Sequence, residues 1–127
     1  MYKITGDAVY INDALKIANN TLGGTFTQGN ILRDEGGGDG GLFKGVLVRY
    51  LLLLITDGNL GAADAARFAG FLKQNAETLW LKGTSRPQIL FSTNWQSIPT
   101  AADLTTQLSG AMLLEAVAKL KEQGVID

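Results

Sequence analysis

The sequence predicts an all-α fold of about four helices. Four segments space their apolar residues by threes and fours, which is the period of an α-helix with one buried face. Glycine-rich or polar stretches separate these segments. A length of 127 residues and a hydrophobic content of 46% suit one globular core. We therefore treat residues 1–127 as a single domain.

The first helix is expected over residues 7–22. One stripe of its surface is apolar and should be buried; it consists of Ala8, Ile11, Leu15, Ala18 and Leu22. Gly23 and Gly24 follow, and glycine readily adopts the left-handed conformation that ends many helices. The glycine-rich stretch 25–41 is expected to be non-helical.

The second helix, expected over residues 42–55, is apolar around nearly its whole circumference. Only Lys44, Arg49 and Tyr50 offer polar atoms. A helix of this kind is normally surrounded by other elements, so we expect it to be the most central of the four. The turn at residues 57–59, Asp-Gly-Asn, ends it.

The third helix is expected over residues 62–80, with one apolar and one charged face. The apolar stripe, predicted to face the core, consists of Ala65, Phe68, Leu72, Ala76 and Leu79. The loop 83–99 that follows is long for a compact domain and is therefore a candidate functional segment. It carries Phe91 and Trp95.

The fourth helix is expected to begin at Thr100. Thr100 and Asp103 form a capping-box pattern directly after Pro99. The predicted buried stripe consists of Leu104, Leu108, Met112, Leu113, Ala116 and Leu120, and Gly124 closes the helix. The four helices then make two αα-hairpins. An alternation of central helices with helices that expose one face to solvent is typical of a double-layered α/α toroid, and also of a helical bundle.

The composition excludes several kinds of site. Without cysteine or histidine, disulfides, thiolate metal sites and imidazole bases are absent, and we expect no cofactor and no metal. The net charge is −1 and no basic cluster occurs, which predicts no binding to nucleic acid. The apolar run 46–55 is too short for a membrane span. The N-terminus lacks a signal-peptide pattern, so the compartment stays open.

Four segments resemble glycoside hydrolase family 76. The segment DGGLFKGVLVRYL at residues 39–51 resembles the FKGxxxRxL segment that recurs in this family and in related fungal wall-crosslinking proteins. NAETLW at residues 75–80 resembles the family's NAxxxW helix end, and residues 94–111 resemble its Trp loop followed by a Gln-x-Ser helix. TGDAVYINDA at residues 5–14 is similar to a helix opening of α/α-barrel carbohydrate enzymes.

The resemblance implies the C-terminal portion of an (α/α)6 barrel that cleaves α-1,6-mannan with retention of configuration. Two αα-hairpins, roughly a third of the barrel, would then form a partial toroid. The family's catalytic groups are two adjacent aspartates, and this sequence contains no such pair. Retaining hydrolysis needs two carboxyl groups about 5–5.5 Å apart. We therefore expect a chain that contributes cleft residues but is inactive as an enzyme by itself.

Five residues are the expected substrate-binding set: Asp39, Phe43, Lys44, Arg49 and Trp95. Charged side chains bind sugar hydroxyls well, and an exposed indole can stack on a pyranose ring. Structural alternatives stay open. Asp39 could cap the helix that follows it, Arg49 could bond backbone carbonyls of neighbouring loops, and Trp95 could form an aromatic lid over the core.

The expected partner is α-mannan or a related polysaccharide. A non-catalytic helical domain that binds carbohydrate or protein is the alternative function, and an active enzyme using Asp34, Glu35 and Asp39 is a third. The full-length family is expected to be secreted or attached to the cell envelope. Because the second helix is apolar on most sides, four helices leave apolar surface uncovered, which predicts a homodimer.

Overall fold

Four long helices build the fold, as the sequence predicts. The computed structural model describes residues 1–127 and places the helices α2 at Ala8–Gly23, α3 at Asp39–Asp57, α4 at Ala62–Lys82 and α5 at Leu104–Glu122. A one-turn helix, α1 at Tyr2–Thr5, precedes them. Two short antiparallel hairpins were not predicted: β1 (Thr27–Gln28) pairs with β2 (Ile31–Leu32), and β3 (Thr84–Ser85) pairs with β4 (Leu90–Phe91).

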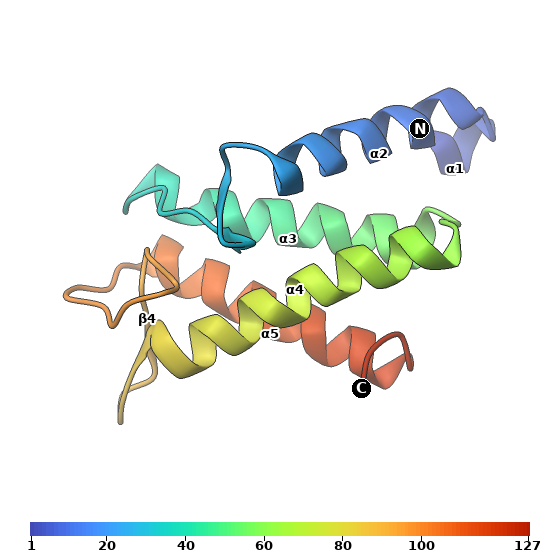
Figure 1. Ribbon diagram of the computed structural model, residues 1–127. Helices are drawn as coiled ribbons and strands as arrows, with labels where there is room; N and C mark the ends of the chain where they lie inside the picture. Colours follow the sequence, from blue (N-terminus) through green and yellow to red (C-terminus); the bar gives the residue numbers. More distant parts are fainter.

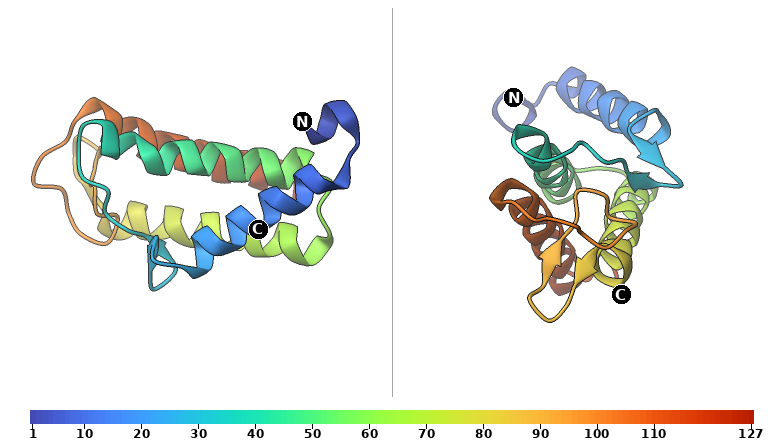
Figure 2. Two further views of the ribbon diagram at one scale, coloured as in Figure 1. Left: turned by 90° about the horizontal axis from the view of Figure 1, so that it is seen from above. Right: turned by 90° about the vertical axis from the view of Figure 1, so that its left-hand side faces the viewer.

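The helices lie in two layers (Figures 1 and 2). Helices α3 and α5 run side by side in one layer, and α2 and α4 lie in the other. Both β-hairpins and the long connections lie at one end of the helices, where α2 and α4 end and where α3 and α5 begin. We call this the hairpin end. None of the helices has the length and hydropathy that crossing a membrane requires.

The core lies between α3, α4 and α5. Its fully buried side chains include Val48, Phe68, Leu72, Leu79, Leu113 and Leu120. The apolar stripe predicted for α4 is confirmed, apart from Ala65, which is half-buried. In α5 the predicted stripe is wrong in its first turns, because Leu104 and Leu108 are exposed and Met112 is half-buried.

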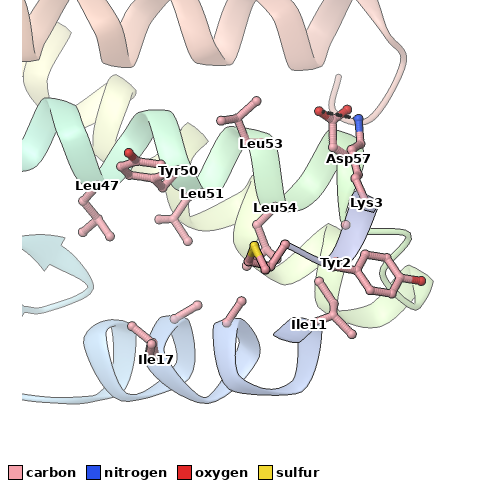
Figure 3. A pocket seen from close by; sticks show the side chains of 14 residues that line it. Tyr2, Lys3, Ile11, Ile17, Leu47, Tyr50, Leu51, Leu53, Leu54 and Asp57 are labelled. Carbon is pink, nitrogen blue, oxygen red and sulfur yellow. Dashed lines mark ion pairs between the residues drawn. The ribbon is translucent and has the colours of Figure 1, made fainter. Parts of the chain in front are cut away.

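Helix α2 is attached less firmly than its sequence predicts. Of its expected stripe only Ala18 is buried, while Ala8 is exposed. A groove of about 450 Å³ separates α2 from α3, and 11 of its 14 lining residues are hydrophobic. Figure 3 shows this α2–α3 groove, with the ion pair between Lys3 and Asp57 (2.9 Å) at one end. Apart from α2 and α3, only the one-turn helix α1 borders this groove, and it covers just one end.

Two predicted helix ends differ from the observed ones. Helix α5 does not begin at Thr100, which lies exposed in the preceding loop. Its N-cap is Asp103, whose carboxylate accepts a hydrogen bond from the Thr106 backbone N–H at 2.8 Å. Gly24 after α2 is extended rather than left-handed, with φ −107°. Gly124 after α5 does adopt the left-handed conformation, with φ 68°.

Helices α3 and α5 approach closely through small residues. The Ser109 hydroxyl donates to the Gly41 carbonyl (2.5 Å) and accepts from the Gly45 N–H (3.0 Å). A Cβ atom on Gly45 would lie 2.9 Å from the Ser109 Cα, which is closer than packed atoms tolerate. This contact fixes the position of α3, which carries the residues of the candidate site.

Candidate functional site

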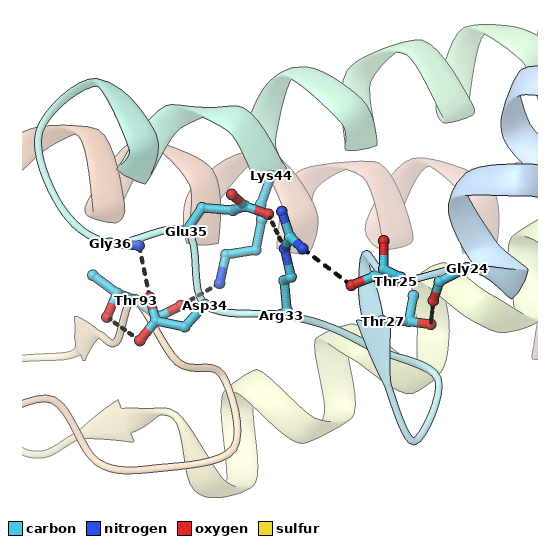
Figure 4. Close-up of polar contacts among 9 residues, drawn as sticks. All are labelled: Gly24, Thr25, Thr27, Arg33, Asp34, Glu35, Gly36, Lys44 and Thr93. Atoms are coloured by element: carbon cyan, nitrogen blue, oxygen red, sulfur yellow. Dashed lines mark hydrogen bonds and ion pairs between the residues drawn. The ribbon is translucent and has the colours of Figure 1, made fainter.

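Two connections meet at the hairpin end, in front of the first turns of α3 (Figure 4). One is the linker of residues 33–38 between β2 and α3, and the other is the loop of residues 92–97 after β4. Gly36 and Gly38 in the linker have positive φ angles of 75° and 59°, which a side chain disfavours. The glycine run is thus needed to turn the chain into α3.

Lys44 of α3 lies where these connections meet. Its side chain is buried, with 4% of the residue exposed. The ammonium donates a hydrogen bond to the Thr93 carbonyl and lies 4.4 Å from the centre of the Trp95 ring. Burial lowers the pKa of Lys44 from 10.5 to about 8, and the negative charges of Asp34 and Glu35 oppose that shift. The side chain therefore remains mostly protonated at neutral pH.

The acidic residues of the linker are engaged in local contacts. The Asp34 carboxylate accepts from the Gly36 N–H (2.8 Å) and from the Thr93 hydroxyl (3.1 Å). Glu35 forms an ion pair with Arg33 at 2.7 Å. The two neighbouring carboxylates thus bind different partners. Asp39 is exposed and forms no hydrogen bond or ion pair through its side chain.

A groove of about 360 Å³ opens between the β1–β2 hairpin, the linker and α3. We call it the linker groove. Its lining combines aromatic, charged and aliphatic side chains, namely Thr21, Phe26, Leu32, Arg33, Glu35, Phe43, Lys44 and Leu47. Phe26 and Phe43 are both exposed, and the Arg33 guanidinium lies 4.8 Å from the centre of the Phe26 ring. Apolar ring surface beside an ion pair suits a ligand that presents both C–H faces and hydroxyl groups.

Of the predicted site residues, the structure places Phe43 and Lys44 together in the lining of the linker groove. Arg49 lies elsewhere, in a groove between α3 and α5 that also contains Met112 and Glu115. It forms no hydrogen bond or ion pair, so the alternative that it bonds loop carbonyls is wrong. The reason is the helical period, since five residues turn Arg49 well away from Lys44.

Trp95 is completely buried, so the expectation of an exposed indole is wrong. Its backbone packs on Gly83, where a Cβ atom would lie 2.7 Å from the Trp95 carbonyl oxygen. Its ring lies beneath the Lys44 ammonium, and Trp95 belongs to the buried hydrophobic core, which agrees with the structural alternative. For Asp39 the capping alternative is also wrong, because Gly38 is the N-cap of α3 and no side chain caps it.

Phe26 and Arg33 were not predicted as site residues. They lie at the two ends of the β1–β2 hairpin, where the Arg33 N–H donates to the Phe26 carbonyl at 3.0 Å. The hairpin has a turn signal in the sequence: Gly29 and Asn30 both have positive φ angles, 61° and 64°, as two-residue hairpin turns require. The Gly-Asn pair therefore predicts a hairpin whose two ends, at Phe26 and Arg33, lie next to each other.

Known proteins resemble this chain in both sequence and structure. The chain matches the sequence profile of Glycosyl hydrolase family 76 over residues 1–124. The solved α-1,6-mannanase GH76A from Salegentibacter sp. HEL1_6 is 43% identical with a TM-score of 0.90; the match covers 94% of this chain and 36% of the mannanase chain. An inactive variant of that mannanase, with two adjacent aspartates replaced by asparagine, was solved in complex with α-1,6-mannotriose.

A second solved structure, the Lin0763 protein from Listeria innocua, is 31% identical with a TM-score of 0.83, over 96% of this chain and 34% of that chain. The chain thus spans about a third of the length of the solved structures that it matches. No curated protein gave a significant match.

Proposed function

The chain belongs to glycosyl hydrolase family 76 and adopts part of its helical toroid, and on this basis we propose that it binds α-1,6-linked mannan oligosaccharides but does not cleave them by itself. The observation that carries the proposal is the linker groove, with Phe26 and Phe43 beside the Arg33–Glu35 ion pair. A similar mannanase, 43% identical to this chain, was solved with α-1,6-mannotriose.

The groove offers the two kinds of contact that a hexose needs. Exposed aromatic rings can cover the C–H faces of a sugar, and charged groups form the stronger hydrogen bonds to its hydroxyls. Its size, about 360 Å³, falls at the small end of the roughly 300–1,000 Å³ typical of small-molecule sites. We infer that it accepts one or two sugar units, with Phe43 as a stacking surface and Arg33 and Glu35 as hydroxyl partners.

Cleavage lacks a matching pair of acids in this chain. Retaining hydrolysis uses two carboxyl groups about 5–5.5 Å apart on either side of the scissile bond. The sequence has no two adjacent aspartates, and the carboxylates nearest the groove, Asp34 and Glu35, are engaged with Thr93 and Arg33. We expect no reducing sugar to be released from α-1,6-mannan; turnover that is abolished by Glu35→Gln would contradict this.

A protein-interaction role is the second candidate. The observation that favours it is the α2–α3 groove, which is mostly hydrophobic and open to solvent (Figure 3). Exposed apolar surface of this extent often marks a contact with another protein. It is compatible with sugar binding, because the linker groove lies at the hairpin end of α3.

Binding is tested by titrating the chain with α-1,6-mannotriose, followed by calorimetry or by NMR. Phe43→Ala should weaken binding about tenfold or more while leaving the melting temperature nearly unchanged, because 60% of Phe43 is exposed. Tyr50→Ala is the matched control, since Tyr50 lies on the same helix and is 63% exposed but lines the α2–α3 groove instead. Equal loss in both variants, or no binding by the wild type, refutes the proposal.

A further inference from the structure

Lys44 is the one charged side chain among the buried residues. An ammonium taken out of water is costly unless polar groups replace the lost hydration. Here the replacement comes from two connections that are far from each other in the sequence. The loop of residues 92–97 supplies the Thr93 carbonyl and the Trp95 ring, and the linker supplies the negative charges of Asp34 and Glu35.

The same two connections are also joined directly. The Thr93 hydroxyl donates to the Asp34 carboxylate at 3.1 Å, next to the Lys44 ammonium (Figure 4). Thr93 therefore contacts both charges: its carbonyl accepts from the lysine and its hydroxyl donates to the aspartate. A single positive charge from α3 thus balances the acidic linker and fastens the 92–97 loop across it.

We propose that Lys44 is a positioning residue whose ammonium locks the 92–97 loop to the 33–38 linker and thereby holds the linker groove in its binding shape. In this role Lys44 need not touch the sugar. It keeps in place the linker residues Arg33 and Glu35, which line the groove. The part of the inference that concerns ligand affinity rests on the proposed function, whereas the lock itself does not.

The lock depends on pH because Lys44 carries its positive charge only while its amine is protonated. Burial brings the pKa of Lys44 down to about 8. From the linker, Asp34 and Glu35 favour the charged form, and Arg33, also in the linker, is paired with Glu35. The 92–97 loop has no ionisable side chain. As the pH rises through about 8, Lys44 loses its charge, and both the cation–π contact and the attraction to the linker are lost.

The lock is tested through Trp95 itself. The chain has two tryptophans, and Trp80→Phe leaves Trp95 as the only indole while preserving a ring beneath the Arg86 guanidinium. In that background, Trp95 fluorescence should follow a one-proton titration with a midpoint near pH 8. Adding Lys44→Met, which keeps most of the length of the side chain but removes the ammonium, should abolish the titration. A flat profile in the Trp80→Phe protein overturns the proposal even if the double variant fails to fold. A fluorescence titration that persists in the Lys44→Met variant also overturns the proposal.

Sugar affinity provides the second readout. At 1.5 pH units above the pKa the protonated fraction falls roughly thirtyfold, so mannotriose affinity should drop by up to about that factor between pH 7 and pH 9.5. Lys44→Met should already bind weakly at pH 7 and should show no such pH dependence. Wild-type affinity that stays constant across this range overturns the positioning role. If the wild type binds no mannotriose at any pH, the proposed function fails instead, while the fluorescence titration still decides whether the lock exists.

Discussion

Asn75 of α4 is completely buried, and both the oxygen and the nitrogen of its side-chain amide form hydrogen bonds. Its Oδ1 accepts from the Leu32 N–H, and its Nδ2 donates to the carbonyls of Asn30 and Phe71, each at 2.9 Å. Because the Arg33 N–H bonds Phe26 across the hairpin, the neighbouring Leu32 N–H points away from β1 and toward α4. Asn75 therefore ties the β1–β2 hairpin, one wall of the linker groove, to the core. We predict that Asn75→Ala is among the most destabilising substitutions in the chain.

The magnitude follows from what each partner loses. The buried Leu32 N–H is left without an acceptor, which costs about 1–3 kcal/mol. The Asn30 carbonyl lies nearer the surface and can turn to water, so its hydrogen bond contributes only about 1 kcal/mol. The Phe71 carbonyl keeps its helical partner and adds little. The sum is about 2–4 kcal/mol, or roughly 8–16 °C in melting temperature at about 4 °C per kcal/mol for a domain of this size.

Urea unfolding followed by circular dichroism measures this free-energy difference. Gln74→Ala is the matched control: the neighbouring side chain is exposed and forms no hydrogen bond, so its removal should change stability by less than about 0.5 kcal/mol. Asn75→Asp separates the two halves of the amide, because it retains an acceptor for Leu32 but sets a carboxylate against the Asn30 carbonyl. It should be at least as destabilising as Asn75→Ala. A loss below about 0.5 kcal/mol for Asn75→Ala would refute the reasoning.

Three further predictions concern packing, charge and assembly. Gly45→Ala should destabilise the chain by about 1–2 kcal/mol, because the added methyl group meets Ser109 on α5. Gly70→Ala is the control: nothing lies within 4 Å of the added methyl group, so this change should stabilise the chain by up to about 1 kcal/mol. If urea unfolding gives changes in free energy of the same sign for both variants, the close approach of α3 and α5 is contradicted. The backbone N–H groups of Thr106 and Gly38 donate to Asp103 and hold its pKa low, so the carboxylate stabilises the fold above the usual carboxyl pKa and loses this effect as the pH falls through the depressed value. The melting temperature of the wild type should therefore exceed that of Asp103→Asn by less at pH 2 than at pH 6. A difference that stays constant with pH would show that the carboxylate charge is not involved. The α2–α3 groove predicts self-association at micromolar concentration, most simply as a two-fold dimer; sedimentation as a 13.5 kDa monomer that binds no hydrophobic dye would show that the helices satisfy their own core.

The sequence was sufficient for the fold class and the family. The 3.6-residue period places α3 and α4 within about three residues of their observed ends, and the short segments around Phe43 and Asn75 are enough to identify family 76, which the sequence profile confirms. The α2 stripe was overestimated because periodicity reports which face is apolar, not whether a neighbour covers it. In α2 part of that face borders the open α2–α3 groove, so Ile11, which lines the groove, is only half-buried.

The candidate site was harder to predict, for a related reason. A motif identifies Lys44 and Trp95 as noteworthy, but it does not say which atoms face solvent. The burial of Trp95 depends on Gly83, a residue 12 positions earlier whose lack of a side chain admits the tryptophan backbone. The position of Arg33 depends on a two-residue turn and on Asn75, and neither of these is visible in the hydrophobic pattern of the chain.

The linker groove depends on polar contacts more than on hydrophobic packing. Its wall is the segment 30–36, which is short, glycine-bounded and mostly exposed beyond Leu32. At one end of this segment, the side-chain amide of Asn75 in α4 forms hydrogen bonds to its backbone. At the other end, Asp34 accepts a hydrogen bond from the Thr93 hydroxyl and is attracted by the charge of Lys44 in α3. Hydrogen bonds require a defined distance and angle, whereas the hydrophobic effect is non-directional. The linker groove should therefore lose its shape when either polar contact is removed, even where the helical core remains folded.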